Sequence, residues 1–131
     1  MARLTNFAEN KLNDHIYGKA TWAAPTNVHM ALFTSDPGET GSLAGEVTGT
    51  NYARKALSAL MGVSASGLTN NSSDIVFNTA SAVWGTITHV GVMPSSAGSE
   101  MMVYAPLETP IYIDTGDTFR INANNMTSLA D

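Results

Sequence analysis

Three histidines are the most obvious residues that could do chemistry, and they lie far apart in the sequence. His15, His29 and His89 are each isolated, and the chain contains no cysteine. A zinc site needs three or four nitrogen or sulfur ligands at one point, so all three imidazoles would have to meet. The spacing instead favours local roles, with His29 and His89 hydrogen-bonded on strands or exposed on a sheet face. We expect no metal site and no cofactor.

Two short motifs match functional loops only in part. Asp114, Gly116 and Asp117 resemble a fragment of a calcium loop, but such a loop needs more carboxylates and a bidentate glutamate. The simpler prediction is that both aspartates cap a hairpin turn. Residues 62–66 (GVSAS) nearly match the G-x-S-x-G nucleophile elbow. An elbow lies between a strand and a helix, whereas this segment leads into a polar loop. We predict no catalytic residue and no enzyme activity.

Residues that could contact a partner are better candidates. Trp22 lies in a linker between alanines, and aromatic side chains are enriched at protein interfaces. Residues 35–51 form a loop that is unusually long for a compact domain, with four glycines and no basic residue. We expect this loop to be flexible and to face a basic or neutral partner. The predicted partner contacts are Trp22, Asp36, Glu39 and Glu46.

The aromatic residues also permit a second interpretation, a sugar-stacking platform. Such a platform would use Trp22, Trp84 and the tyrosines, as a receptor-binding protein requires. Trp84, however, stands beside Val83 at the start of a predicted strand. We therefore predict that Trp84 belongs to the core, which leaves Trp22 as the tryptophan for a surface contact.

The elements that would position these residues begin with a helix over residues 4–17. Its apolar residues recur every four positions and form one stripe. Asn6 and Glu9 fit a capping-box start, with Asn6 as the N-cap, and Gly18 can end the helix in the left-handed conformation. We expect the helix to cover one end or face of a sheet. The stripe consists of Leu4, Ala8, Leu12 and Ile16.

Residues 28–123 carry the pattern of a β domain. Alternation over 86–93 places Ile87, His89, Gly91 and Met93 on one face. Pro106 and Pro110 belong at an edge or a bend, because proline removes a ladder donor. Short strands with turns between them indicate a mainly β fold, a β-sandwich or barrel-like antiparallel arrangement with one N-terminal α-helix. The predicted strands are 28–34, 52–58, 75–77, 83–84, 86–93, 101–107, 111–113 and 119–123, with polar loops at 35–51 and 62–74. Helical spacing competes with alternation over 52–61.

Length and charge restrict the class of protein. The chain has 131 residues, which suits one domain over residues 1–131. Charged residues make up only 13%, and the formal net charge is −5. The six basic residues form no stripe, so we predict no nucleic-acid partner. No apolar run is long enough to span a membrane, and the N-terminus has no apolar signal region.

The order of several segments resembles a family of small tailed-bacteriophage virion proteins. The matching segments are LTNFAENKL, VHMALFTSDPGETG, EVTGTNYARKAL, AVWGTITHVGVM and YAPLETPIYIDTGDTFRI, followed by the asparagine-rich end. Together they cover nearly the whole chain, which is shorter between Met61 and Asp74 than the family pattern. Members are labelled head decoration (cement) proteins or tail-fibre proteins. The resemblance implies a virion structural part and supplies no catalytic residues.

We therefore expect a non-enzymatic capsid decoration protein on the virion surface, made in the host cytoplasm. It would bind the major capsid protein or other virion proteins in many copies, as a homo-oligomer. One alternative is a tail fibre, collar or baseplate component. Another is a carbohydrate-binding module for receptor recognition, although the chain lacks the carboxylate pair of a glycosidase.

Overall fold

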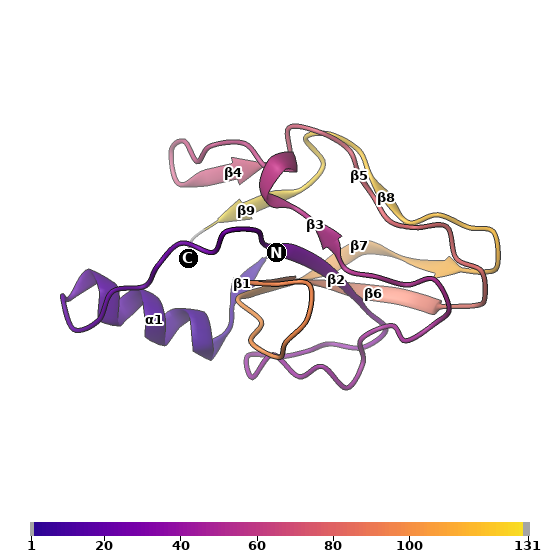
Figure 1. The fold of residues 1–131 in the computed structure, drawn as a ribbon. Helices are drawn as coiled ribbons and strands as arrows, with labels where there is room; N and C mark the ends of the chain where they lie inside the picture. Colours follow the sequence, from indigo (N-terminus) through magenta and orange to yellow (C-terminus); the bar gives the residue numbers. More distant parts are fainter. Residues whose placement is uncertain (1, 130–131) are drawn as a thin grey trace.

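The main layer of the structure is a five-stranded antiparallel sheet. The structure is a computed structural model, and it describes residues 2–129. The strand order is β1-β7-β6-β2-β3 (Figure 1), so β6 lies at the centre. The strands are β1 (Arg3–Leu4), β2 (His29–Phe33), β3 (Lys55–Ala56), β6 (Gly85–Met93) and β7 (Val103–Ile113).

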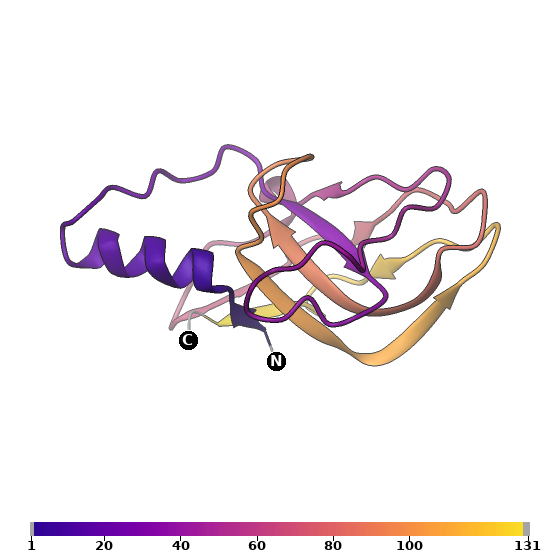
Figure 2. The same ribbon diagram turned by 90° about the horizontal axis from the view of Figure 1, so that it is seen from below.

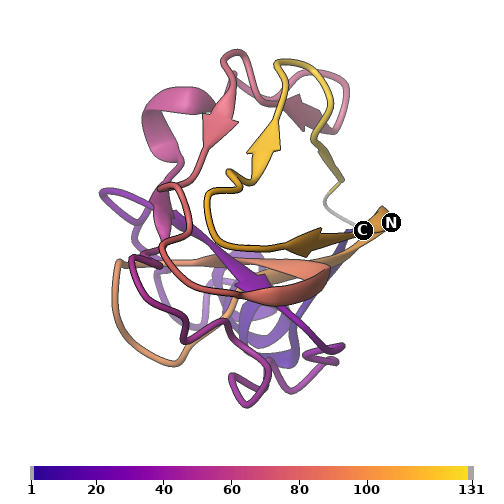
Figure 3. The same cartoon turned by 90° about the vertical axis from the view of Figure 1, so that its right-hand side faces the viewer.

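A second layer of two short strand pairs covers one face of this sheet (Figure 3). β4 (Leu68–Asn70) pairs with β9 (Thr127–Leu129), and β5 (Ile75–Val76) pairs with β8 (Arg120–Ile121). Both pairs are antiparallel. The prediction of a mainly β fold with antiparallel sheets and one N-terminal helix is confirmed.

The larger core fills the space between the two layers. Met30 and Leu32 of β2 contribute to it from the main sheet, and Ile75 and Phe119 contribute from the opposite side. All four side chains are buried. Burial of a large apolar side chain stabilises a fold by about 1.5–3 kcal/mol, so this interface between layers holds the fold together.

Trp84 is part of this core, as predicted. Its side chain is only 5% exposed. The ring packs edge-to-face on Tyr52, with centroids 5.5 Å apart. The indole Nε1–H donates a hydrogen bond of 3.1 Å to the carbonyl oxygen of Thr50. A buried indole usually finds such an acceptor, and here the acceptor comes from the end of the loop 35–51.

A smaller core lies on the opposite face of the main sheet. It joins Ala31 and Phe33 of β2 with Met93, Met101 and Tyr104, and Leu43 of the loop packs against it. β2 therefore has a core on each face. This explains why its sequence is apolar at successive positions instead of alternating.

The strict alternation expected for residues 86–93 is wrong at one point. The pairing of β6 with β7 changes register between Ile87, which faces Ile111, and His89, which faces Pro106. Because of this irregularity Ile87 packs in the larger core together with Val90. A β-bulge of this kind changes which side chains share a face, and the residue types alone do not reveal it.

β7 forms one continuous strand instead of the two strands that were expected. Among residues 2–129, β1 pairs with Val103 and Tyr104 alone, so the rest of β7 is a sheet edge on that side. Pro106 and Pro110 lie in this part. The prediction that both prolines belong at an edge or a bend is confirmed.

Two parts of the chain differ from their expected structure. The polar loop over 62–74 contains β4, whose partner β9 lies in the C-terminal segment. The strand expected over 52–58 is reduced to the two residues of β3 and is followed by a 3-10 helix, η1 (Ser58–Leu60). In both cases pairing with a distant strand decided the structure.

The N-cap of the helix α1 (Asn6–Ile16) lies one residue earlier than expected. Its N-cap is Thr5, not Asn6, and the Thr5 hydroxyl accepts a hydrogen bond from the Ala8 N–H at 3.3 Å. The same hydroxyl donates to the carbonyl oxygen of Met101. Thr5 is buried, so its tie to the sheet fixes where the helix starts. Gly18 takes the expected left-handed conformation, with φ of 68°.

α1 does not cover a face of the sheet. Figures 1 and 2 show that it projects away from the strands. Ala8 is its only buried residue, whereas Ile16 is 61% exposed. The helix is joined to the sheet at its start, where Thr5 and Ala8 are buried and Thr5 bonds the backbone of Met101. Within residues 2–129, no helix combines the length and the apolar character needed to cross a membrane.

Candidate functional site

The loop 35–51 lies against the face of the main sheet that carries the smaller core. Val47 N–H donates to the carbonyl oxygen of Leu32 at 3.0 Å, and Thr34 N–H donates to that of Gly45 at 2.9 Å. Val47 is buried, as is Pro37. These contacts overturn the expectation of a flexible loop, because its backbone is hydrogen-bonded to the sheet and its apolar residues complete the cores. Replacing the loop by a tight turn would expose both cores.

Asp36 and Glu39 lie on the outer surface of this loop. Their side chains are 64% and 60% exposed. Asp36 Oδ1 accepts a hydrogen bond of 2.9 Å from the Gly38 N–H, which fixes the turn. Glu39 Oε1 lies 3.9 Å from a guanidinium nitrogen of Arg3. Asp36 Oδ1 likewise lies 3.8 Å from His89 Nε2. Exposed pairs at these distances contribute little to stability, and the exposed fractions leave both carboxylates accessible to a partner. Their contact role stays a prediction.

Glu46 is held inside the protein. Its two carboxylate oxygens accept hydrogen bonds of 2.8 Å from Arg54 Nε and Nη2, and Oε2 also accepts one of 2.8 Å from the Tyr52 hydroxyl. The Glu46 and Arg54 side chains are only 14% and 8% exposed. This bidentate pair links the loop to the segment before β3. Its carboxylate is already fully engaged, and its role as a partner contact stays a prediction without support from this geometry.

The electrostatics of this network follow from its burial. Burial raises the pKa of Tyr52 well above its usual value, and the neighbouring Glu46 carboxylate adds to the effect. The hydrogen bond to Glu46 raises the pKa of Arg54 in turn. Arg54 Nη2 also donates to the carbonyl oxygen of Gly98 at 3.1 Å, whereas its Nη1 is buried and finds no acceptor among residues 2–129. The network therefore links three segments of the chain, those that contain Glu46, Arg54 and Gly98.

Trp22 belongs to a protruding unit that we call the α1 arm (residues 5–27). Its ring packs edge-to-face on Phe7 of α1, with centroids 6.4 Å apart. Its backbone N–H donates to His15 Nδ1 at 3.1 Å. Trp22 thus fastens the returning segment of the arm to the helix. A surface hollow of about 470 Å³ lies beside it, lined in part by Lys11 and Glu100.

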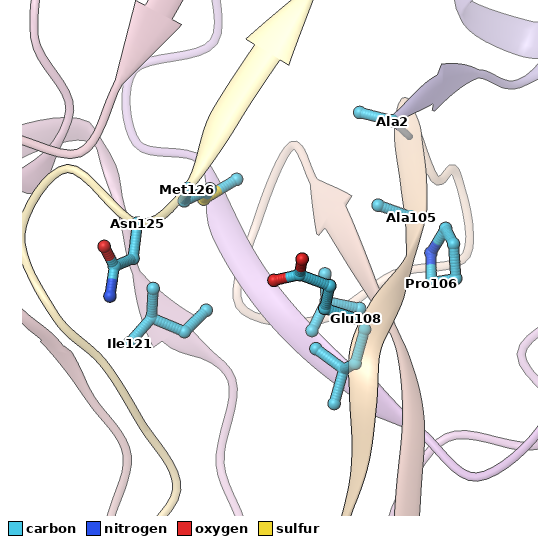
Figure 4. Close-up of a pocket in the computed structure, with 9 residues that line it drawn as sticks. Ala2, Ala105, Pro106, Glu108, Ile121, Asn125 and Met126 are labelled. Carbon is cyan, nitrogen blue, oxygen red and sulfur yellow. The ribbon is translucent and has the colours of Figure 1, made fainter.

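An apolar groove opens at the edge of the sandwich, between β7 and the C-terminal segment (Figure 4). Its volume is about 210 Å³. Figure 4 shows Glu108 on its β7 side and Ile121 and Met126 on the opposite side. A smaller apolar hollow adjoins it near Tyr104. The groove residues are Ala2, Val90, Ala105, Pro106, Leu107, Glu108, Ile121, Asn125 and Met126.

The candidate chemical motifs have local structural roles. Asp114 Oδ1 accepts from the Thr115 N–H at 2.7 Å, and Asp117 Oδ2 accepts from the Asp114 N–H at 3.0 Å. The prediction that these aspartates cap a turn is confirmed. In the segment 62–66, Ala65 pairs with Leu68 across a tight turn. That segment leads into strand β4, not into a helix, so it has no elbow geometry.

The histidines also make local contacts. His29 Nδ1 lies 3.1 Å from the carbonyl oxygen of Asn27, and His89 Nδ1 lies 2.9 Å from the Thr88 hydroxyl. The local hydrogen bonds predicted for His29 and His89 are confirmed. Within residues 2–129, no three His, Cys, Asp or Glu side chains come together as a metal site would require.

A comparison with known protein families decides the class of this protein. The family model described as "Podophage GP4 fiber I protein gp80" matches residues 3–128. The chain belongs to this family. It is therefore a structural protein of a tailed-phage virion, as the order of its segments predicted. No curated protein matches the chain.

The family match covers the loop, the arm and the groove together, so all three belong to the virion protein.

Two residues that organise these surfaces were not predicted from the sequence. The charge of Arg54 was a possible signal. A basic residue eight positions after Glu46 can pair with its carboxylate across the end of the loop. Asn71 gives no signal, since it lies in a polar run, yet it is fully buried. Its side chain bonds the backbone of Ser73, Asn122 and Met126.

Proposed function

We propose that this protein decorates the phage head, where many copies bind the capsid lattice through the loop 35–51. The observation that supports this proposal is the acidic surface of that loop, which is already formed in the folded protein. Asp36 and Glu39 stand 64% and 60% exposed on a backbone that is hydrogen-bonded to the sheet. A preformed surface binds without the entropic cost of ordering a loop. No chemical reaction is part of this function, and its mechanism is adhesion.

Weak contacts suffice for such a protein if they are repeated by symmetry. Avidity allows many modest contacts to hold a shell of proteins in place. The acidic loop surface fits a partner that presents basic or neutral residues, such as the major capsid protein. Arg3 and the arm lie beside the same surface, because Asn6 N–H donates to the carbonyl oxygen of Glu39 at 2.9 Å.

Electron cryomicroscopy of purified virions tests this proposal. We expect density for this protein over the head lattice, with the loop 35–51 facing the capsid. The matched substitutions Asp36→Asn and Glu39→Gln together should lower the copy number per virion, whereas Asp114→Asn, in a turn distant in sequence from the loop, should not. Density confined to the tail would reject head decoration. Unchanged occupancy of the double variant would reject this loop as the docking surface.

A second candidate function is a fibre component, and the description of the family favours it. The family description names a fiber protein. In that case the same domain would be a building block of a fibre or its attachment, with the acidic loop facing a neighbouring fibre protein. The same images separate the two functions by location. Labelling with an antibody against the purified protein provides an independent check.

A further inference from the structure

The end of the α1 arm carries large apolar side chains that the described residues leave exposed. Tyr17 is 75% exposed and Ile16 is 61% exposed. Ile16 ends α1, and Figures 1 and 2 show this end of the helix farthest from the strands. The base of the arm, in contrast, is fixed through the buried Thr5 and Ala8. A fixed projection with an apolar end suits insertion into a second molecule.

The groove between β7 and the C-terminal segment is complementary to this end in size and character. An apolar cavity of about 150 Å³ accepts a benzene ring, so the groove, at about 210 Å³, has room for a phenol. Ala105, Leu107 and Met126 supply apolar contacts. Pro106 and Pro110 on β7 oppose addition of a further strand at this edge. Side-chain insertion is thus the better mode of binding here.

The charge beside Tyr17 is complementary to the charge at the groove. The α1 arm as a whole is neutral, because residues 5–27 hold two Lys residues and two Asp or Glu residues, so the complementarity lies in single residues. Lys19 lies two positions beyond Tyr17. Glu108 lies on the groove rim and makes no ion pair among the described residues. Opposite charges at a rim direct the orientation of docking.

The arm cannot place its end in its own groove. α1 begins at Asn6, close in sequence to Ala2, which lines the groove. An 11-residue helix is about 16 Å long, and this rigid length holds Tyr17 away from the starting point. The occupant must therefore come from another molecule, and a second copy of this chain carries the matching end.

We propose that the α1 arm of one copy inserts Tyr17 into the groove of a neighbouring copy, with Lys19 facing Glu108. The two surfaces differ, so the contact runs head to tail and each copy can both donate and accept an arm. Such contacts build rings if the rotation closes and chains if it does not. This inference concerns the protein in solution and holds for either location on the virion.

Sedimentation of the purified full chain over a concentration series tests the contact. We expect concentration-dependent association that Tyr17→Ser weakens about 30-fold, as loss of a buried aromatic anchor does. The control Val63→Ser changes an apolar residue that is 95% exposed and far from either surface in sequence, and it should have no effect. A wild-type protein that remains monomeric throughout the series would overturn the proposal.

Charge exchange then tests the pairing of the two surfaces. Lys19→Glu and Glu108→Lys should each weaken association, and the two changes in one chain should restore it. Lys55→Glu serves as the control for charge. If none of these variants changes the strength of association, the copies contact each other through a different surface and the proposed contact is wrong.

A covalent test uses the absence of native cysteine. A mixture of Lys19→Cys chains and Glu108→Cys chains should be joined into a dimer by a short bifunctional thiol cross-linker, because a facing lysine and glutamate hold their Cα atoms farther apart than the about 7 Å that a direct disulfide allows. A mixture of Lys55→Cys and Glu108→Cys chains should not. Equal yields from the two mixtures would contradict the proposed docking geometry.

Discussion

The two connections that flank β2 use their residues in opposite ways. The α1 arm enters β2 and the loop 35–51 leaves it, and both are long and polar. The loop buries Val47 and Pro37 and engages Glu46 with Arg54. The arm buries Ala8 and leaves its large apolar residues at its end exposed. Length therefore does not show whether a connection is part of the folded body, whereas its internal partners do.

The two connections therefore have separate roles. The loop is part of the folded body, and its outer carboxylates stand on a fixed support. The arm adds little to the body beyond its anchor at Thr5. Changes in the loop and the residues that hold it should thus alter stability, and changes at the end of the arm should alter association. The following predictions test that division, from the largest effect to the smallest.

Trp84→Ala should give the largest loss of stability, about 3–5 kcal/mol, as truncation of a buried aromatic does. The change leaves a cavity beside Tyr52 and removes the hydrogen bond to Thr50 at the end of the loop. Chemical denaturation followed by circular dichroism measures the effect. An unchanged unfolding midpoint would mean that the loop is not anchored through this indole.

Glu46→Ala should cost about 3 kcal/mol, because it leaves the buried Arg54 guanidinium without its counter-ion. The same denaturation experiment applies. Glu39→Ala is the matched control, since it removes a 60% exposed carboxylate from the outer side of the same loop. Similar losses for both would show that Glu46 lies at the surface.

Thr5→Ala should cost about 1–2 kcal/mol, the usual range for loss of an N-cap. The effect should be concentrated in α1, so amide exchange should accelerate in the arm more than in β6. Thr5→Ser keeps the hydroxyl and is expected to retain most of the protection. Uniform acceleration over the whole chain would indicate that the arm and the body unfold together.

Tyr17→Ser should change stability by less than about 0.5 kcal/mol, as most exposed substitutions do. Its side chain is 75% exposed, so little packing is lost in a single molecule. Thermal melting of a dilute sample is the suitable measurement. A loss of more than about 1 kcal/mol under dilution would place Tyr17 in the body of the protein.

The sequence was informative where local pattern and tertiary packing agree. β2 could be predicted because both of its faces are buried, and Trp84 could be placed in the core because it begins a strong strand. Gly18 ended the helix as expected, since the left-handed conformation favours glycine. The cap moved from Asn6 to Thr5 because Thr5 also bonds a carbonyl of a residue 96 positions away.

The remaining differences arise from distant partners. β4 and β9 pair across the ends of two polar segments, and Asn71 holds the second segment by four hydrogen bonds of its side chain and backbone, to Asn122, Asn124 and Met126. Nothing in the polar run around Asn71 specifies these partners. The role of Glu46 was equally hidden, because the residues alone do not show whether a carboxylate faces Arg54 or solvent.

The prolines of β7 have a consequence for the proposed packing of many copies side by side. An exposed sheet edge is a template for pairing with the same edge of another copy. Pro106 and Pro110 lack backbone N–H donors, and Glu108 between them adds a charge. In the proposed assembly, neighbouring copies can thus stand close together without pairing their β7 edges into a continuous sheet.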